Sequence, residues 1–161
     1  EAHQTKCKDY IQSVLANAKM LAETLKNNGF KIYSGGTDTH LLLVDLRPFN
    51  VKGNLASESL CRANITCNKN GIPFDTEKPM ITSGIRLGSQ AATTRGFGLK
   101  EFEKVGELIT KVIKGLSENP EDNDKVENEV RNEVVSLCSN FPIYKNLNKW
   151  FALVKKKVRP L

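Results

Sequence analysis

The chain has 161 residues, a length that fits one domain with a buried core. Its net charge is +6, but four of the positive side chains lie within residues 155–161, so the rest of the chain carries only +2. The charge therefore does not predict the basic face, interleaved with stacking aromatic residues, that is typical of a nucleic-acid-binding domain. No apolar run reaches the length of a membrane span, so no membrane partner is expected.

Four cysteines and two histidines give the chain few metal ligands, and no two cysteines form a C-x-x-C pair. We therefore expect no metal site. Cys61 and Cys138 fall at apolar-periodic positions and are predicted to be small buried residues. A reduced, cytoplasmic setting is the simplest expectation, and an organellar one stays open. The segment Glu1 to Gln4 has neither an initiator methionine nor a signal pattern, so we expect a longer reading frame or processing.

The first predicted elements are a helix and two strands. Apolar residues recur at helical spacing from Ile11 to Leu25, and Asn28-Gly29 is a typical helix end. Alternation predicts a short strand over residues 30–34, and the Gly-Gly segment that follows is typical of a turn. The nearly continuous apolar run from Leu41 to Leu46 predicts a buried strand.

The middle of the chain is predicted to alternate between short elements and a loop. Residues 54–63 are predicted to form a helix and residues 65–67 a brief strand. Residues 68–80 contain several Asn, Gly, Pro and Asp residues and predict an irregular segment. Strand character returns over residues 81–87.

Two helices are predicted after a second Gly-rich stretch. The first carries apolar residues at helical spacing from Phe102 to Leu116, and the second from Val126 to Cys138. Pro120 separates them. The residues after Tyr144 could form a short amphipathic helix, and a solvated terminus is the stronger interpretation. The order of elements indicates an α+β fold, a small and mostly antiparallel sheet backed by helices.

Arg86 is a candidate binding residue because it stands in an apolar strand. Ile85 and Leu87 flank it, so strand alternation sends its side chain to the opposite face. A guanidinium there can hold a carboxylate through two parallel hydrogen bonds. On composition alone, a structural salt bridge is the stronger alternative.

Asn70 and His40 lie in turn-rich segments. The amide of Asn70 offers a donor and an acceptor, which suits the edge of a pterin or an amide, although most Asn-Gly turns are structural. The segment Ser34 to His40 precedes no helix, so its glycines do not predict a phosphate cradle. His40 is a candidate general base without a visible partner, and fixing the turn together with Asp38 is the stronger interpretation.

These segments together resemble the C-terminal part of serine hydroxymethyltransferase. The matching segments, in order and in register, are 34–46, 63–73, 82–86 and 93–97. The resemblance runs from near the start to about Tyr144, and residues from Lys145 onward depart from the family pattern. Several motifs that agree in spacing are more specific than any one of them.

The resemblance implies the aspartate-aminotransferase-like fold of fold-type I pyridoxal 5'-phosphate enzymes. Residues 1–144 would be its small C-terminal domain, and residues 145–161 a basic tail of unknown role. The implied activity is that of glycine hydroxymethyltransferase, which interconverts serine plus tetrahydrofolate with glycine plus 5,10-methylenetetrahydrofolate in one-carbon metabolism. Pyridoxal phosphate would be the cofactor and tetrahydrofolate the co-substrate, in a homodimer or a dimer of dimers.

The resemblance also assigns residues. Arg86 matches the arginine that clamps the substrate carboxylate, and Asn70 matches the asparagine that contacts the folate. Arg95 and His40 are candidates for support behind these contacts, although a structural pair is the stronger interpretation of Arg95. Three residues align, by position alone, with the loop along the folate: Glu77, Lys78 and Pro79.

The sequence lacks the family's cofactor lysine, which lies in a Thr-rich segment ending His-Lys. Neither His3 nor His40 is followed by lysine. We therefore expect no catalytic residue in this chain and no activity from it alone. Two other interpretations stay open: a dimerisation or scaffold domain with Arg86 paired internally, and a nucleic-acid-binding module that uses the basic residues of segment 155–159.

Overall fold

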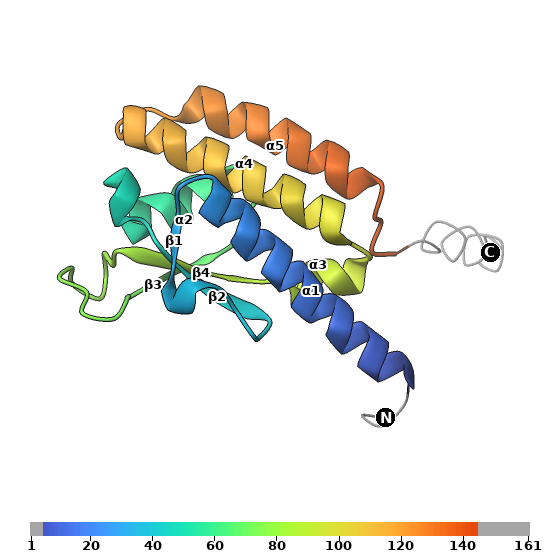
Figure 1. The fold of residues 1–161 in the computed structure, drawn as a ribbon. Helices are drawn as coiled ribbons and strands as arrows, with labels where there is room; N and C mark the ends of the chain where they lie inside the picture. The colour runs from blue at the N-terminus through green and yellow to red at the C-terminus, as the bar shows by residue number, and fades with distance from the viewer. Residues whose placement is uncertain (1–4, 145–161) are drawn as a thin grey trace, which may run out of the picture.

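A computed structural model describes residues 5–144, so the predicted basic tail lies outside the described residues. The helices are α1 (Thr5–Asn27), α2 (Gly53–Arg62), α3 (Gln90–Arg95), α4 (Leu99–Glu118) and α5 (Asp124–Ser139). The strands are β1 (Lys31–Ile32), β2 (Leu41–Asp45), β3 (Asn68–Asn70) and β4 (Gly84–Gly88). The strands form one antiparallel sheet in the order β1-β2-β4-β3, and α1, α4 and α5 lie on one side of it (Figure 1). The predicted α+β class is confirmed.

The long helices α1 and α4 pack closely because one residue at their contact has no side chain. A Cβ on Gly106 would lie 2.7 Å from Cγ2 of Thr24 on α1. Leu21 and Leu25 of α1 and Ile109 of α4 are buried in the shared core. Gly29 ends the first helix with φ of +94°, the left-handed conformation that the Asn-Gly sequence predicts.

The two faces of the sheet differ in chemistry. Val44 and Ile85 are opposite each other on β2 and β4, and both are fully buried against the helices. The next pair along, Leu43 and Arg86, faces the other way, and Asn68 of β3 stands on the other side of Arg86. Because side chains alternate along a strand, this second face is mixed: it carries Arg86 and Asn68 beside the apolar Leu43.

The strand predicted at residues 65–67 is wrong, since β3 occupies Asn68–Asn70 inside the segment predicted to be irregular. Antiparallel pairing with Arg86, Ile85 and Gly84 of β4 selects these residues. Ile65 instead packs against the core from a loop. The helix α3 is not predicted from sequence, because its Ala- and Thr-rich residues carry no apolar period and none of them is buried.

Two other predicted strands are shorter in the structure, at residues 31–32 and 84–88. After β1 the chain turns at Ser34, whose φ is +62°. Before β4, Thr82 also has a positive φ, and its carbonyl accepts a hydrogen bond from Gly53 N at 2.9 Å. The residues before β4 therefore cover the first N–H groups of α2 and do not join the sheet.

The three helices predicted after residue 50 are confirmed as α2, α4 and α5, within a few residues at each end. The predicted burial of Cys61 is wrong: α2 buries Ala56, Ser59 and Leu60, so the next position faces solvent. Cys138 is partly buried against the core. Among the helices that the structure describes, none is long and apolar enough to cross a membrane.

Candidate functional site

Arg86 projects from the middle of the sheet on the face away from the helices. Its neighbours Ile85 and Leu87 are 0% and 6% exposed, whereas Arg86 itself is exposed. The alternation predicted from sequence is therefore confirmed. The strand fixes where the side chain leaves the backbone, and the core residues on either side hold the strand in place.

The guanidinium of Arg86 forms no salt bridge with any carboxylate of residues 5–144. A buried carboxylate on the same face, Asp45, is committed to Arg47, with 2.6 Å between Nη2 and Oδ2, and to Lys31 at 3.7 Å. Burial raises the pKa of Asp45, but the hydrogen bonds and charge of Arg47 outweigh it and hold that pKa below its ordinary value. Asp45 is thus a structural anion, and the structural salt bridge favoured for Arg86 on composition alone is not formed within the described residues.

Arg86 lines an open cleft of about 860 Å³. Asn70 and Pro73 form one part of its wall, and the turn over residues 34–39 forms another. Tyr33 joins these two parts, because its hydroxyl donates to the carbonyl of Pro73 at 3.2 Å. The fold therefore brings Arg86 and Asn70, which the family resemblance predicts to contact the substrate carboxylate and the folate, into one cleft.

The turn over residues 34–39 is held by threonines and a lysine. Thr37 Oγ1 donates to Leu41 O at 2.5 Å and accepts from Thr39 N at 3.1 Å. Lys26 Nζ donates to the carbonyl of Gly35 at 2.8 Å. The prediction that Asp38 and His40 fix this turn is wrong, because the threonine hydroxyls reach its backbone groups. His40 contributes a carbonyl that accepts from Ser89 N at 3.0 Å, and it does not line the cleft.

Asn70 ends β3 opposite Gly84. Its Nδ2 donates to the carbonyl of Gly71 at 2.7 Å, so the amide is oriented by its own turn. A Cβ on Gly84 would lie 2.7 Å from Val44 O and 3.0 Å from Asn70 O. Gly84, two residues before Arg86, is thus required because β2 and β3 approach it closely on either side, as a glycine inside a strand predicts.

Asp75 organises the loop between β3 and β4, a role that sequence reasoning missed. Its carboxylate accepts from the backbone N–H groups of Ile72 and Glu77, at 3.1 and 3.0 Å, and from Ser83. Burial raises the pKa of Asp75, but these hydrogen bonds outweigh it and hold the pKa well below its ordinary value. A lone Asp in a turn-rich loop gives only a weak signal for this role.

The three residues aligned with the folate loop lie apart from the cleft of Arg86. The Glu77 carboxylate is paired with Lys52. The carbonyl of Lys78 accepts from Ile81 N at 2.8 Å, and the side chains of Lys78 and Pro79 are exposed. None of the three lines the cleft, so their assignment stays a prediction based on position.

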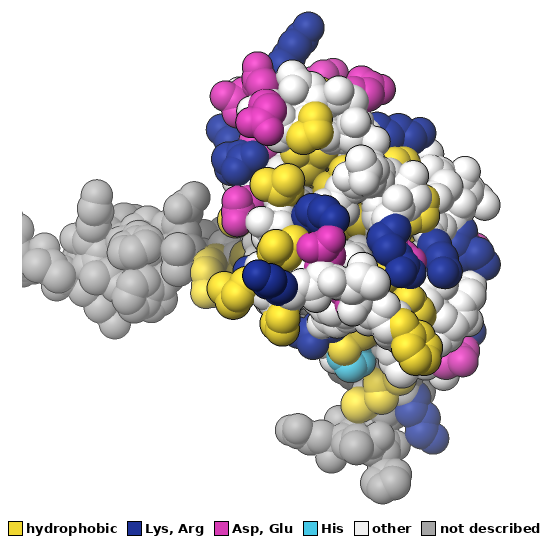
Figure 2. Space-filling model, turned by 90° about the vertical axis from the view of Figure 1, so that its left-hand side faces the viewer, with side chains coloured by type: hydrophobic (Ala, Val, Ile, Leu, Met, Phe, Trp, Pro, Cys, Tyr) yellow, Lys and Arg dark blue, Asp and Glu magenta, His cyan; other side chains and the backbone are white. Residues whose placement is uncertain are grey.

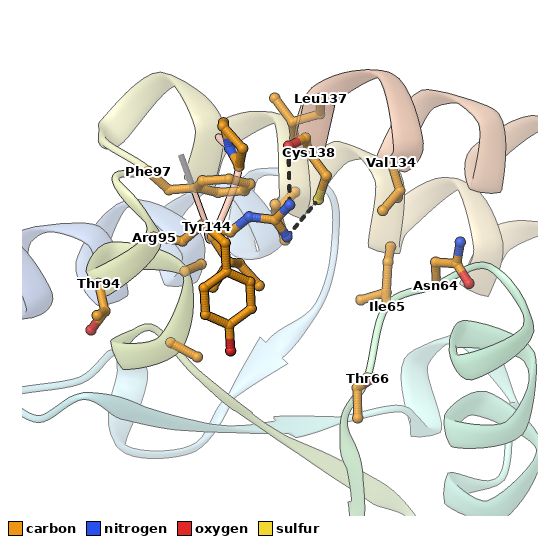
Figure 3. Close-up of a pocket in the computed structure, with 15 residues that line it drawn as sticks. Asn64, Ile65, Thr66, Thr94, Arg95, Phe97, Val134, Leu137, Cys138 and Tyr144 are labelled. Atoms are coloured by element: carbon orange, nitrogen blue, oxygen red, sulfur yellow. Dashed lines mark hydrogen bonds between the residues drawn. The ribbon is translucent and has the colours of Figure 1, made fainter. Parts of the chain in front are cut away.

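Arg95 is a structural residue by its contacts. Its Nη2 donates to the carbonyl of Cys138 at 3.0 Å and its Nε to the carbonyl of Phe141. Figure 3 shows the guanidinium pointing at Cys138 from α3. The Cys138 carbonyl also accepts from Phe141 N at 3.0 Å, and Phe141 lies just beyond α5, so Arg95 ties α3 to the turn that ends α5. The preferred interpretation of Arg95 as structural thus agrees with the geometry.

The described residues give no support to a nucleic-acid interface or a metal centre. On the face in Figure 2, Lys and Arg side chains are interspersed with acidic and uncharged ones and do not form a basic stripe. Within residues 5–144, no three His, Cys, Asp or Glu side chains are placed to hold a metal ion. The fold and cleft define a small α+β domain whose cleft contains an exposed arginine, Arg86, without a carboxylate partner within residues 5–144.

Comparison with known proteins identifies the family. A family model described as Serine hydroxymethyltransferase matches residues 1–109. A Serine hydroxymethyltransferase of Pelagibacter ubique (strain HTCC1062) is 85% identical over 147 residues, which are 91% of this chain and 34% of that protein. One from Marinomonas sp. (strain MWYL1) is 61% identical over 145 residues, 90% of this chain and 34% of its own. The chain belongs to the serine hydroxymethyltransferase family, and it spans about a third of the length of these curated relatives.

Proposed function

We propose that this chain is the substrate-carboxylate and folate-binding part of a serine hydroxymethyltransferase. The complete enzyme would interconvert serine plus tetrahydrofolate with glycine plus 5,10-methylenetetrahydrofolate. The observation that carries the proposal is Arg86, exposed and without a carboxylate partner within residues 5–144, in one cleft with Asn70. Family membership supports the reaction class.

Arg86 would hold the amino-acid carboxylate through two parallel hydrogen bonds. A planar guanidinium matches the two oxygens of a carboxylate, and a strand with buried neighbours gives it a fixed origin. Fixing the carboxylate also fixes which bond at the amino acid's α-carbon faces the reacting group. Asn70, on the neighbouring strand, offers an amide donor and acceptor for the heterocycle of the folate.

The cleft fits a substrate carboxylate better than the cofactor. Its turn over residues 34–39 does not open a helix, so it lacks the helix N-terminus that often holds a phosphate. Pyridoxal phosphate, when bound, supplies an electron sink for the carbanion at the amino acid's α-carbon. The residues that hold it would lie in the two thirds of the relatives' length that this chain does not span.

The partners follow from the same proposal. The chain would work with the cofactor-holding part of the enzyme and with a second subunit, as a homodimer or a dimer of dimers in the cytoplasm. Alone, it would bind neither cofactor nor serine productively. Adding pyridoxal phosphate to the isolated chain should therefore produce no protein-bound chromophore and no turnover of serine. A stable absorbance band bound to the chain would contradict this expectation.

The central experiment uses a chimera in which this chain replaces the matching third of the Pelagibacter ubique relative. Arg86→Ala should raise the KM for serine by roughly two or more powers of ten, because a charged, bidentate contact contributes a few kcal/mol. Arg86→Lys should recover little, since an ammonium lacks the fork geometry. Arg131→Ala is the control, because Arg131 lies on α5 outside the cleft. An unchanged KM for Arg86→Ala would overturn the proposal.

A further inference from the structure

A second hollow shares no lining residue with the cleft of Arg86, and the proposed reaction does not use it. Its volume is about 1040 Å³, and it is bounded by α3, α4, α5 and the loop after α2. Most of its wall is apolar, including Ile65, Phe97, Val105, Val134 and Leu137. Figure 3 shows Val134, Ile65 and Thr66 on one side and Tyr144 on the other.

The charged side chain in the wall of this hollow already has hydrogen-bond partners within the domain. Arg95 lines the hollow, but its guanidinium donates to the carbonyls of Cys138 and Phe141 and to Sγ of Cys138. A carboxylate or phosphate would have to break these bonds. An apolar occupant leaves them intact and removes apolar surface from water.

The described chain ends at the rim of the hollow. Ile143 and Tyr144 both line it and are 68% and 71% exposed, which is unusual for large apolar side chains. Seventeen residues, 145–161, follow directly. Six residues from Tyr144 reach Trp150, a span of roughly 20 Å when extended and about 9 Å when helical. The whole hollow is therefore within reach of the following segment.

The sequence of that segment has one apolar stripe. Leu147, Trp150, Phe151 and Val154 recur at i, i+3, i+4 and i+7, the spacing of an amphipathic helix. Six Lys and Arg residues and no acidic residue make up its charge, and three of them fall opposite the stripe: Lys145, Lys149 and Lys156. A segment with this pattern has an apolar face to bury and a basic face to leave in water.

We propose that the apolar stripe of residues 147–154 packs into this hollow of its own chain. The contact is intramolecular, so its effective concentration is high and a modest apolar contact is sufficient. Trp150 and Phe151 supply the largest side chains of the stripe. The basic residues of the tail then belong to the outer surface of a docked helix. This inference concerns only the hollow and the tail and does not depend on the proposed enzyme activity.

The chain has a single tryptophan, so fluorescence of the intact 161-residue chain reports on Trp150 alone when the excitation wavelength is one that the three tyrosines do not absorb. We expect an emission maximum at shorter wavelength than in guanidinium, and slow quenching by iodide. Val134→Asp should shift the emission to longer wavelength and increase quenching. Val135→Asp is the matched control, since Val135 is on the same helix, 56% exposed and outside the hollow.

Thr66→Arg is a second test that spares the core, because Thr66 is exposed and lines the hollow. It should reproduce the shift while circular dichroism stays unchanged. Emission typical of an exposed indole in the unaltered chain would overturn the proposal. So would emission that neither hollow variant changes, or a short-wavelength emission that disappears on dilution, which would indicate docking onto a second copy.

Discussion

The carboxylate of Asp75 holds Ser83 through two hydrogen bonds, from the backbone N–H at 2.9 Å and from the hydroxyl at 2.7 Å. Ser83 directly precedes β4, the strand that carries Arg86. The loop between β3 and β4 is therefore tied to the strand of the proposed substrate arginine by one side chain. A shift of this loop would be transmitted to Arg86 and Asn70, the two residues proposed to bind ligands.

Asp75→Ala should lower the free energy of unfolding by about 3 kcal/mol, because it removes a charged acceptor shared by several donors. Urea denaturation measures the change. Asp38→Ala is the control: its carboxylate is exposed in the turn over residues 34–39 and accepts no hydrogen bond from the described residues. Equal stability of the two variants would show that Asp75 does not organise the loop.

Glu127 should make stability depend on pH in acid. Its carboxylate contacts Arg62 at 2.6 and 2.7 Å and Ser59 at 2.6 Å. The hydrogen bonds of Arg62 outweigh burial and lower the pKa of Glu127. A lowered pKa means that its contribution is fully present above the ordinary value of 4.5 and is lost as the pH falls through the folded value.

Glu127→Gln tests this pH dependence. It should lower stability by about 1–2 kcal/mol at pH 7, discounted because Arg62 is half exposed. The difference from the unaltered chain should shrink below pH 4.5. Urea titrations at pH 7 and in acid measure both quantities, and a difference that stays constant would contradict the assignment.

Replacing Arg95 and replacing Arg86 should have different effects on the free energy of unfolding. Arg95→Ala removes charged donors from carbonyls at the end of α5 and should cost about 2 kcal/mol. Arg86→Ala should change the stability of the isolated chain by less than about 0.5 kcal/mol, because Arg86 is exposed and unpaired within the described residues. Thermal unfolding of the two variants provides the comparison. A large loss for Arg86→Ala would favour the scaffold interpretation.

Gly53 should tolerate no side chain. A Cβ there would lie 2.1 Å from Thr82 Oγ1 and 2.6 Å from the carbonyl of Gly84, which is backbone and cannot rotate away. Gly53→Ala is expected to cost about 2 kcal/mol or more in unfolding free energy. Gly36→Ala is the matched control, since a Cβ on Gly36 would meet nothing within 4 Å and its φ of 171° is ordinary extended backbone.

Thiol reactivity should distinguish two cysteines that are close in sequence. Burial raises the pKa of the Cys67 thiol to about 12, so its reactive thiolate is scarce at neutral pH. Cys61 is exposed on α2. At pH 8 a thiol reagent should modify Cys61 well before Cys67, as peptide mass spectrometry would show. Modification of both at one rate would mean that the loop after α2 opens.

The outward direction of Arg86 was predictable because a strand has a period of two and both neighbours are apolar. The strand at Asn68–Asn70 was not, since its polar residues carry no strand pattern and its place is set by pairing with β4. Asp75 was missed for a similar reason: its four donors come from residues that only the folded loop brings together.

The sequence by itself determined the α+β class, the long helices and the face on which Arg86 stands, because apolar periodicity is local and survives without knowledge of the partners. It also carried the family motifs in register. Only the tertiary structure decided that Arg86 and Asn70 share a cleft, whereas Arg95 binds carbonyls at the end of α5. It also decided that Cys61 is exposed. These outcomes depend on contacts between segments far apart in the chain, and such contacts leave no local pattern in the sequence.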